Sequence, residues 1–215
     1  MESRATKTNK DSHACDLLAR HNCPVPYHEV RTRFLGNIAS PDLSASPLAT
    51  VHSLWGGQFP ACESVDAANE IVGVLINGLW NSLTQHMNRS EPFHLISMPI
   101  DATAFSVAAY ALTRQQELDG FIQGLFNGAD NLLLPTRALC AVDILAEARL
   151  KLAGIQTLVN EPAMRARQHD LIATAEHLRQ MTPFLEQEIH TAVIECSQAR
   201  HMMLRSRRPP GRRLN

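Results

Sequence analysis

The chain has 215 residues, a formal net charge of −1 at pH 7 and 5% aromatic residues within a hydrophobic fraction of 45%. A chain of this length can bury a large core without disulfide or metal support. Few aromatic residues and many aliphatic and alanine side chains favour helices packed on helices over β-sheets. The near-zero charge excludes a strong field over the whole surface, so a polyanion would need a local patch. We therefore expect an all-α fold, an irregular helical bundle.

The cysteines and the apolar runs bear on the compartment. The five cysteines are odd in number and irregularly spaced, which is typical of a reduced compartment rather than of a disulfide framework. The first residues contain no apolar stretch of a secretory leader. The longest nearly continuous apolar run, residues 71–80, has about half of the ~20 residues that span a bilayer. We therefore expect a cytoplasmic protein with no membrane span.

Residues 1–26 are predicted to be mostly disordered, with one short helix. Residues 1–10 are polar and carry no large apolar side chain that could join a core. Helical spacing begins near residue 11 and continues to about residue 21. Pro24 and Pro26 then end the helix, because proline lacks the N–H group that a helix interior needs.

A helical core domain is expected over residues 27–160. Apolar residues repeat at helical spacing over residues 27–38, and a turn-rich stretch at residues 40–47 predicts a linker. Residues 48–55 add one or two helical turns, and the two glycines that follow end them in the manner of a helix C-cap.

The clearest helical pattern covers residues 64–88. Ser64 is an N-cap residue, and apolar side chains repeat every three to four residues after it. Gly73 and Gly78 each cost roughly 1 kcal/mol relative to alanine in a helix, so we expect another element to approach closely there. The width of the apolar face predicts that this helix is central to the core. That face consists of Ile71, Val72, Leu75, Ile76, Leu79, Trp80 and Leu83.

The next elements are an irregular segment and two glycine-rich helices. Residues 93–99 are expected to be irregular or briefly extended, and residues 101–112 form a helix of small residues. A second helix is predicted over residues 114–126. Glycines recur along it every four residues, line one of its faces and predict close contact with another helix before the helix ends near the last of them. These glycines are Gly120, Gly124 and Gly128.

Two long helical segments complete the chain. A helix opens at Pro135 and runs to about residue 160, and a C-terminal helical extension covers residues 162–204. Pro183 is predicted to divide this extension into two helices or to kink it. Residues 205–215 are expected to be a disordered, arginine-rich tail. Apolar residues of the extension alternate at spacings of four and three, which defines a heptad seam. The heptad seam consists of Leu171, Ala175, Leu178, Thr182, Leu185, Ile189, Ala192 and Cys196.

Two stretches of this sequence carry a family resemblance. The first is LWGGQFPACESVDAANEIVGVLINGLWNSL at residues 54–83, followed by EPFHLI at residues 91–96. The second is ELDGFIQGLFNGAD at residues 117–130. A tryptophan-glycine turn, a long amphipathic helix, a proline-phenylalanine segment and a glycine-x-x-x-glycine helix in this order resemble the YecA/YgfB-like group of bacterial proteins. The resemblance covers about residues 48–160.

The resemblance implies a helical fold and a partner-binding role, because some relatives bind regulatory or secretion-related proteins, and it implies no reaction. Two features of the family are missing from this sequence. An early leucine-aspartate-glycine-leucine-leucine helix is not evident before the tryptophan turn. The C-terminal zinc motif of some members is also absent, since residues 205–215 contain neither cysteine nor histidine. Zinc binding is therefore not carried over, and no cofactor is expected.

One cluster has the residue types of a metal site. Zinc needs four ligands that converge tetrahedrally, whereas each pair in this cluster is separated by a single residue, and helical residues two apart point away from each other. A short N-terminal helix with incidental polar residues explains the cluster better than a metal site does. The residues are His13, Cys15, His21 and Cys23.

Catalysis has no supporting motif, so we predict that the protein is not an enzyme. Cys62 follows a phenylalanine-proline turn, and the nearest histidines in the sequence are His52 and His86, but no nucleophile-elbow or thiol-protease context surrounds it. Two closely spaced pairs of carboxylates are interpreted as solvated helix faces. These pairs are Glu117 with Asp119 and Asp143 with Glu147.

The function predicted from these patterns is that of a non-enzymatic interaction or adaptor protein, which binds a partner or itself as a homo-oligomer. The heptad seam must be covered by a partner, by a second copy or by the same chain, and the Trp55 turn is a second apolar surface. The predicted partner-binding residues are Trp55, Leu171, Leu178, Leu185 and Ile189.

The alternative function is that of a nucleic-acid-associated regulator. The C-terminal tail could neutralise several phosphates without reading their sequence, although a solvated tail explains the same residues. No aromatic residues are interleaved with the arginines to stack on bases. The arginines of this alternative are Arg205, Arg207, Arg208, Arg212 and Arg213.

Overall fold

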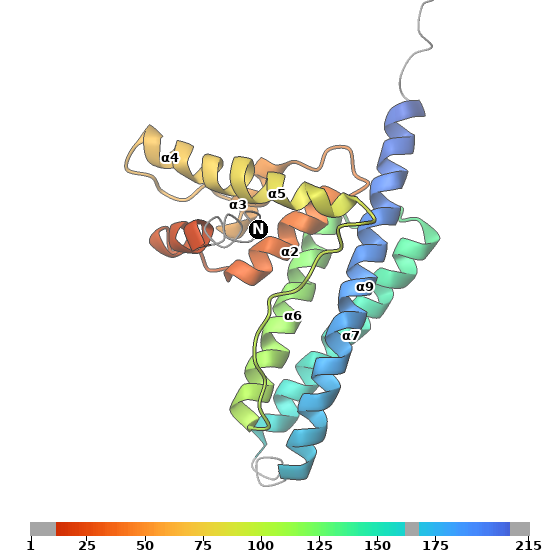
Figure 1. Cartoon of the computed structure of the whole chain (residues 1–215). Helices are drawn as coiled ribbons and strands as arrows, with labels where there is room; N and C mark the ends of the chain where they lie inside the picture. The colour runs from red at the N-terminus through yellow and green to blue at the C-terminus, as the bar shows by residue number, and fades with distance from the viewer. Residues whose placement is uncertain (1–11, 162–167, 207–215) are drawn as a thin grey trace, which may run out of the picture.

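The computed structural model describes residues 12–161 and 168–206, and every regular element in these two stretches is helical (Figure 1). The predicted all-α fold is therefore confirmed. The predicted disorder of residues 1–10 lies outside the described residues, as does that of residues 207–215. The predicted tail at residues 205–215 begins too early, because Arg205 and Ser206 are the last residues of a helix. A helical segment at residues 12–20 precedes the other elements. These elements are α2 (Tyr27–Ala39), α3 (Pro47–Leu54), α4 (Val65–Val72), the π-helix η1 (Gly73–Trp80), α5 (Asn81–Leu83), the 3₁₀-helix η2 (Thr84–Met87), α6 (Ala104–Phe126), α7 (Thr136–Asn160) and α9 (Gln168–Ser206).

Three long helices, α6, α7 and α9, form the body of the molecule (Figure 1). Helix α7 packs against both α6 and α9, and α2 packs along α6. The shorter elements from α3 to η2 lie across one end of these helices (Figure 1). The C-terminal extension, helix α9, is not a separate arm, because it also packs against α2 and α6.

The contact between α2 and α6 depends on glycines from both helices. A Cβ atom added at Gly120 would lie 2.5 Å from the carbonyl oxygen of Glu29, and one added at Gly124 would overlap the carbonyl oxygen of Arg33. On α2, a Cβ atom at Gly36 would overlap the carbonyl oxygen of Phe121. The two backbones are therefore in direct contact, which confirms the predicted close approach at Gly120 and Gly124. The prediction is wrong for Gly128, which follows the end of α6 and where an added Cβ would meet nothing within 4 Å.

The segment after Ser64 differs from the central helix that was predicted. Ser64 does cap α4, because its Oγ accepts a hydrogen bond of 3.1 Å from the N–H of Ala67. The helix then widens into η1 between Gly73 and Trp80. The predicted close approach at the glycines is wrong, because a Cβ at Gly73 would meet nothing within 4 Å and one at Gly78 only the Gly73 carbonyl oxygen at 3.5 Å. The segment lies at one end of the bundle rather than at its centre (Figure 1).

Helix α6 (Ala104–Phe126) is one helix where two were predicted, over residues 101–112 and 114–126. Thr103 caps α6 with its Oγ1, which accepts a hydrogen bond of 3.2 Å from Ser106, and the helix continues without a break to Phe126. It ends as predicted near Gly128, because Asn127 and Gly128 take positive φ angles of 49° and 79°. This left-handed ending is common at helix C-termini.

Helix α9 continues through Pro183, so the prediction of two separate helices at this point is wrong. Proline removes one backbone hydrogen bond and costs about 3 kcal/mol in a helix interior. The packing on both sides of the proline compensates, since Leu178 and Leu185 are fully buried. Hydrogen bonds add to this packing: Thr182 shares one of 2.7 Å with the hydroxyl of Tyr110.

The glycine contact leads to a stability prediction. Gly124→Ala should lower the free energy of unfolding by about 2 kcal/mol or more, because the new methyl group overlaps the backbone of α2 and forces the helices apart. Gly154→Ala is the matched control, because a Cβ at Gly154 meets nothing within 4 Å, and it should raise stability by about 0.5–1 kcal/mol. Urea unfolding followed by circular dichroism measures both. Equal stability of the two variants would contradict the contact.

Candidate functional site

The heptad seam of α9 lies inside the molecule. Leu171 is 2% exposed, and Leu178, Leu185 and Ile189 are 0% exposed. The chain's own helices cover these side chains, because α9 packs against α7, α2 and α6. The assignment of these four residues as partner-binding residues is therefore corrected: they form the intramolecular core and present no surface to a partner.

Trp55 is also engaged within the chain. Its side chain is half-buried against the core, and its indole Nε1–H donates a hydrogen bond of 3.0 Å to the carbonyl oxygen of His21. This bond ties the turn after α3 to the end of the N-terminal helical segment. Trp55 thus positions that segment and leaves only part of its ring on the surface.

Two residues of the possible metal cluster, His13 and Cys23, have different partners. His13 lies 3.7 Å from the carboxylate of Glu70, which also forms an ion pair of 2.6 Å with Arg20. The Cys23 thiol faces the carbonyl oxygen of Leu54 at 3.8 Å. In residues 12–161 and 168–206, no three or more His, Cys, Asp or Glu side chains gather as metal ligands would.

Neither Cys62 nor Cys196 has the surroundings of a catalytic thiol. The Sγ of Cys62 donates to the carbonyl oxygen of Pro60 at 3.3 Å, and the ring of His52 instead packs edge-on against Phe59 with 5.7 Å between centroids. Cys196 is fully buried, and this burial raises the pKa of its thiol to about 12. A thiol with such a pKa stays protonated at neutral pH and is a poor nucleophile.

A buried ion pair was missed by the sequence analysis. Arg114 and Glu117 are 2% and 0% exposed and form an ion pair inside α6. Burial raises the pKa of the Glu117 carboxyl, and the charge of Arg114 acts in the opposite direction. The interpretation of Glu117 as part of a solvated face is therefore wrong, whereas its neighbour Asp119 is partly exposed and pairs with Arg149 at 2.8 Å.

The buried pair holds the irregular segment at residues 92–101 against the bundle. Glu117 Oε1 accepts a hydrogen bond of 2.8 Å from the N–H of Ile96, and Arg114 Nη2 donates one of 2.6 Å to the Ile96 carbonyl oxygen. The pair thus replaces the backbone partners that a neighbouring strand would supply, and its role is structural.

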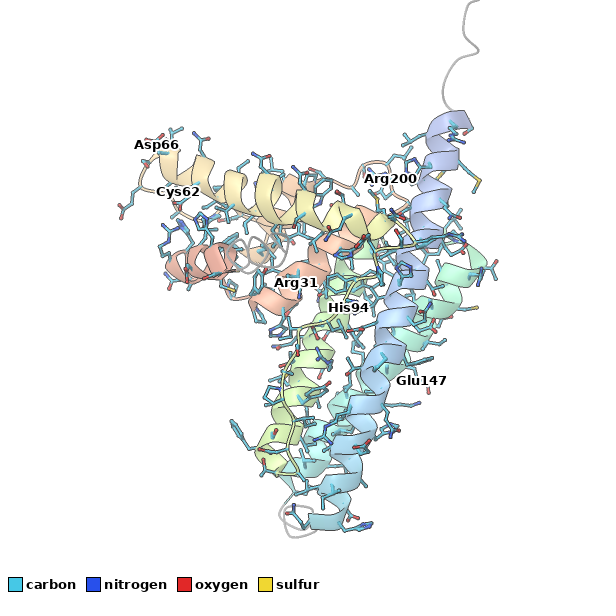
Figure 2. All side chains as sticks on the ribbon, in the orientation of Figure 1. Arg31, Cys62, Asp66, His94, Glu147 and Arg200 are labelled. Carbon is cyan, nitrogen blue, oxygen red and sulfur yellow. The ribbon has the colours of Figure 1, made fainter. Side chains whose placement is uncertain are left out.

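Two residues of α9 hold the same segment from the other side. Glu186 accepts a hydrogen bond of 3.0 Å from the N–H of Leu95 and one of 2.9 Å from the His94 ring, and Arg179 donates one of 2.6 Å to the Ile100 carbonyl oxygen. His94 lies close to Arg31 of α2 (Figure 2), whose Nη2 donates to the His94 carbonyl oxygen at 3.5 Å.

The best candidate for an interaction site is a groove between α7 and α9, which we name the α7–α9 groove. It has a volume of about 440 Å³ and is apolar along its floor, with Ile144 and Ala148 on α7 and Met181 and Phe184 on α9. Phe184 is 50% exposed and lies beside these apolar residues, so the exposed apolar surface is contiguous rather than scattered. Its polar rim consists of Glu147, Lys151, His177 and Gln180.

Helix α7 carries further exposed apolar side chains, which do not line the groove. Leu139 and Leu150 are 47% and 64% exposed, and their spacing of three helical turns places them on one side of the helix. Helix α7 therefore carries apolar residues on its outer side as well as on its buried side. Figure 2 shows Glu147, which shares this outer side, pointing away from the bundle. The sequence pattern indicates this exposed apolar surface, because apolar residues occur all around α7 rather than on one face of the helix.

The arginine tail is described only at its beginning. Arg205 is exposed in the last turn of α9, where the helix projects beyond the bundle (Figure 1). The other four arginines of the nucleic-acid alternative, at positions 207, 208, 212 and 213, lie outside the described residues.

Comparison with known proteins identifies no family for this chain. No protein-family model matches it, and neither a curated protein nor a solved structure does. The resemblance to YecA/YgfB-like proteins therefore remains a prediction. Within the part of the chain that the structure describes, no helix is both long and apolar enough to cross a membrane.

Breaking the buried pair should be far more costly than breaking an exposed one. Arg114→Met leaves Glu117 uncompensated in the core and should lower the free energy of unfolding by about 3–5 kcal/mol. Lys151→Met removes the exposed pair with Glu147 and should cost less than about 1 kcal/mol. Denaturant unfolding of both variants measures the difference, and similar small losses would show that the pair does not hold the segment.

Proposed function

We propose that this chain is a non-enzymatic interaction protein that associates with a second copy of itself through the α7–α9 groove. The observation that carries the proposal is the half-exposed Phe184 beside the apolar floor of Ile144, Ala148 and Met181. Covering these side chains would remove apolar surface from water, which is the main favourable term in protein association.

The form and the charges of the groove favour a second copy as its occupant. Two antiparallel helices offer a groove into which the ridge of another helix fits, and two such pairs related by a two-fold axis make a four-helix arrangement. In a two-fold interface the same residues face each other from both sides. The rim suits this arrangement, because Glu147 and Lys151 form an ion pair of 2.8 Å and present both signs of charge.

Two further observations support a role in binding rather than catalysis. The resemblance to YecA/YgfB-like proteins implies partner binding without a reaction. The buried charged residues Arg114 and Glu117 are occupied in holding the backbone and are not directed into a cleft. A cytoplasmic location is part of the proposal and is supported by the odd, irregularly spaced cysteines.

The dimer is tested by the mass of the protein in solution. The full chain should sediment as a species of twice 23.8 kDa, and Phe184→Asp should convert it to a monomer, because a carboxylate would then be buried in the apolar groove. Phe105→Asp is the matched control, since Phe105 is 85% exposed at the start of α6, away from the groove, and it should leave the mass unchanged.

Analytical ultracentrifugation over a range of concentrations makes this measurement, and circular dichroism checks that both variants remain helical. A wild-type protein that stays monomeric at high concentration would overturn the proposed dimer. A dimer that Phe184→Asp leaves intact would place the interface elsewhere on the molecule.

Nucleic-acid binding through the C-terminal tail is the second candidate function. It is favoured by the charge distribution, because Glu195 is the last acidic residue and the remaining chain contains six arginines. Arg205 is exposed, and α9 projects beyond the bundle (Figure 1). A nucleic-acid strand bound there would therefore not clash with the other helices.

A gel-shift experiment with duplex DNA tests this second candidate. Binding by the full chain should weaken roughly hundredfold between 50 and 200 mM salt, because several phosphate contacts release counterions. Replacing the arginines at positions 205, 207, 208, 212 and 213 with glutamine should abolish the shift. Binding that ignores salt, or that survives the replacement, would contradict a role of the tail.

A further inference from the structure

A second pocket lies at the projecting end of α9, away from the α7–α9 groove. It has a volume of about 270 Å³ and is formed where the last turns of α9 meet the end of α2, η1 and η2. Figure 2 shows Arg200 on the side of α9 that faces these elements. The residues that line the pocket are Ile38, Trp80, Met87, Ser197, Arg200, His201 and Leu204.

The walls of this pocket are apolar and are held in place. Ile38 is 2% exposed in α2, and Trp80 closes η1 next to it. The indole Nε1–H of Trp80 donates a hydrogen bond of 3.3 Å to Asn37 Oδ1, which fixes the ring. Met87 and Leu204 are 37% and 47% exposed, so they form an open mouth. An apolar chain can therefore enter without displacing core residues.

The pocket contains a buried hydroxyl group without a partner. Ser197 is 5% exposed, and its Oγ has no hydrogen-bond partner in the structure. Buried hydroxyl groups are normally hydrogen-bonded, because burial removes their bonds to water and an unpaired group destabilises the fold. Alanine would fill nearly the same space at this position, so packing alone does not explain the hydroxyl group of Ser197. The orphaned hydroxyl therefore points to a hydrogen-bond acceptor that enters the pocket.

The charges beside the hydroxyl favour an anionic acceptor. Arg200 and His201 line the pocket, and none of its lining residues is acidic. Arg200 also acts on Asp42, whose pKa is held low mainly by hydrogen bonds from Ser44 and to a smaller extent by the charge of Arg200. Both carboxylate oxygens of Asp42 accept hydrogen bonds from Ser44, so the guanidinium of Arg200 can serve a bound anion.

We propose that this pocket binds a short apolar chain that ends in an anionic group, such as a medium-chain carboxylate. The chain would lie against Ile38, Trp80 and Leu204, and the anionic group would accept a hydrogen bond from the Ser197 hydroxyl and face Arg200. The volume lies just below the ~300–1,000 Å³ of typical small-molecule pockets, which limits the chain to a short one. The inference is independent of the proposed dimer, because no lining residue is shared with the α7–α9 groove.

Calorimetric titration of the full chain with octanoate tests the proposal. Binding should saturate at one octanoate per chain, and octanol should bind roughly tenfold more weakly, because it lacks the charge-assisted hydrogen bond. Tryptophan fluorescence should shift with the same midpoint, also in Trp55→Phe, because Trp80 lines the pocket. Absence of saturable octanoate binding would overturn the proposal, and equal affinity for octanol would overturn the anionic group.

Variants of the pocket separate specific binding from adsorption to apolar surface. Ser197→Ala and Arg200→Gln should each weaken octanoate binding several-fold with little effect on octanol. Leu204→Asp should weaken both ligands, because it places a charge at the mouth; Leu204 is exposed enough for the variant to fold. Arg205→Gln is the matched control on the same helix end, does not line the pocket and should bind as the wild type does. Equal losses in all four variants would contradict the assigned pocket.

Vesicles distinguish a free acid from a lipid as the source of the chain. The full chain is sedimented with vesicles of phosphatidylcholine and phosphatidylglycerol, with and without octanoate. Co-sedimentation of the protein that octanoate prevents would assign the pocket to a lipid. Octanoate binding without sedimentation would assign it to a free acid. Sedimentation that octanoate and Leu204→Asp leave unchanged would show that vesicles are bound elsewhere and would exclude a lipid from this pocket.

Discussion

The close contact between α2 and α6 is the constraint on which the rest of the structure depends. Gly36, Gly120 and Gly124 have no side chains at the crossing, so the two backbones touch. This contact fixes the position of α2. Residues of α2 in turn form hydrogen bonds with η1 and α3 at the end of the bundle. Asn37 binds the Trp80 indole of η1, and Arg33 donates at 3.4 Å to the carbonyl oxygen of Ser53 in α3. A wider separation of the two helices would displace this whole layer.

The irregular segment at residues 92–101 shows how a mostly helical core accommodates backbone without regular structure. Its N–H and carbonyl groups need partners wherever they are buried. Glu117 and Arg114 supply them from α6, and Glu186 and Arg179 supply them from α9. The buried side chains of Arg114 and Glu117 thus stabilise the backbone of this segment. The α7–α9 groove and the pocket at the end of α9 are lined mainly by apolar side chains.

Helix α9 connects the two proposed binding surfaces and keeps them apart. Its middle part packs against α7 and leaves the α7–α9 groove with Phe184 open to solvent. Its last turns run past the start of α7, where Ser197 and Leu204 complete the pocket with Trp80. Because no lining residue is shared, self-association and ligand binding can occur on one molecule without competing for the same side chains.

The sequence by itself determined the helical class, the N-cap at Ser64, the helix end near Gly128 and the close approach at Gly120 and Gly124. These features depend on local spacing and on residue chemistry, which can be read along one chain. Only the tertiary structure decided that the heptad seam of α9 is internal and that Glu117 is buried. A heptad pattern is the same whether its apolar face is covered by the same chain or by a partner. The pattern alone therefore does not show which neighbour covers the face. Continuity through Pro183 and the orphaned Ser197 hydroxyl likewise depend on contacts between residues far apart in the chain.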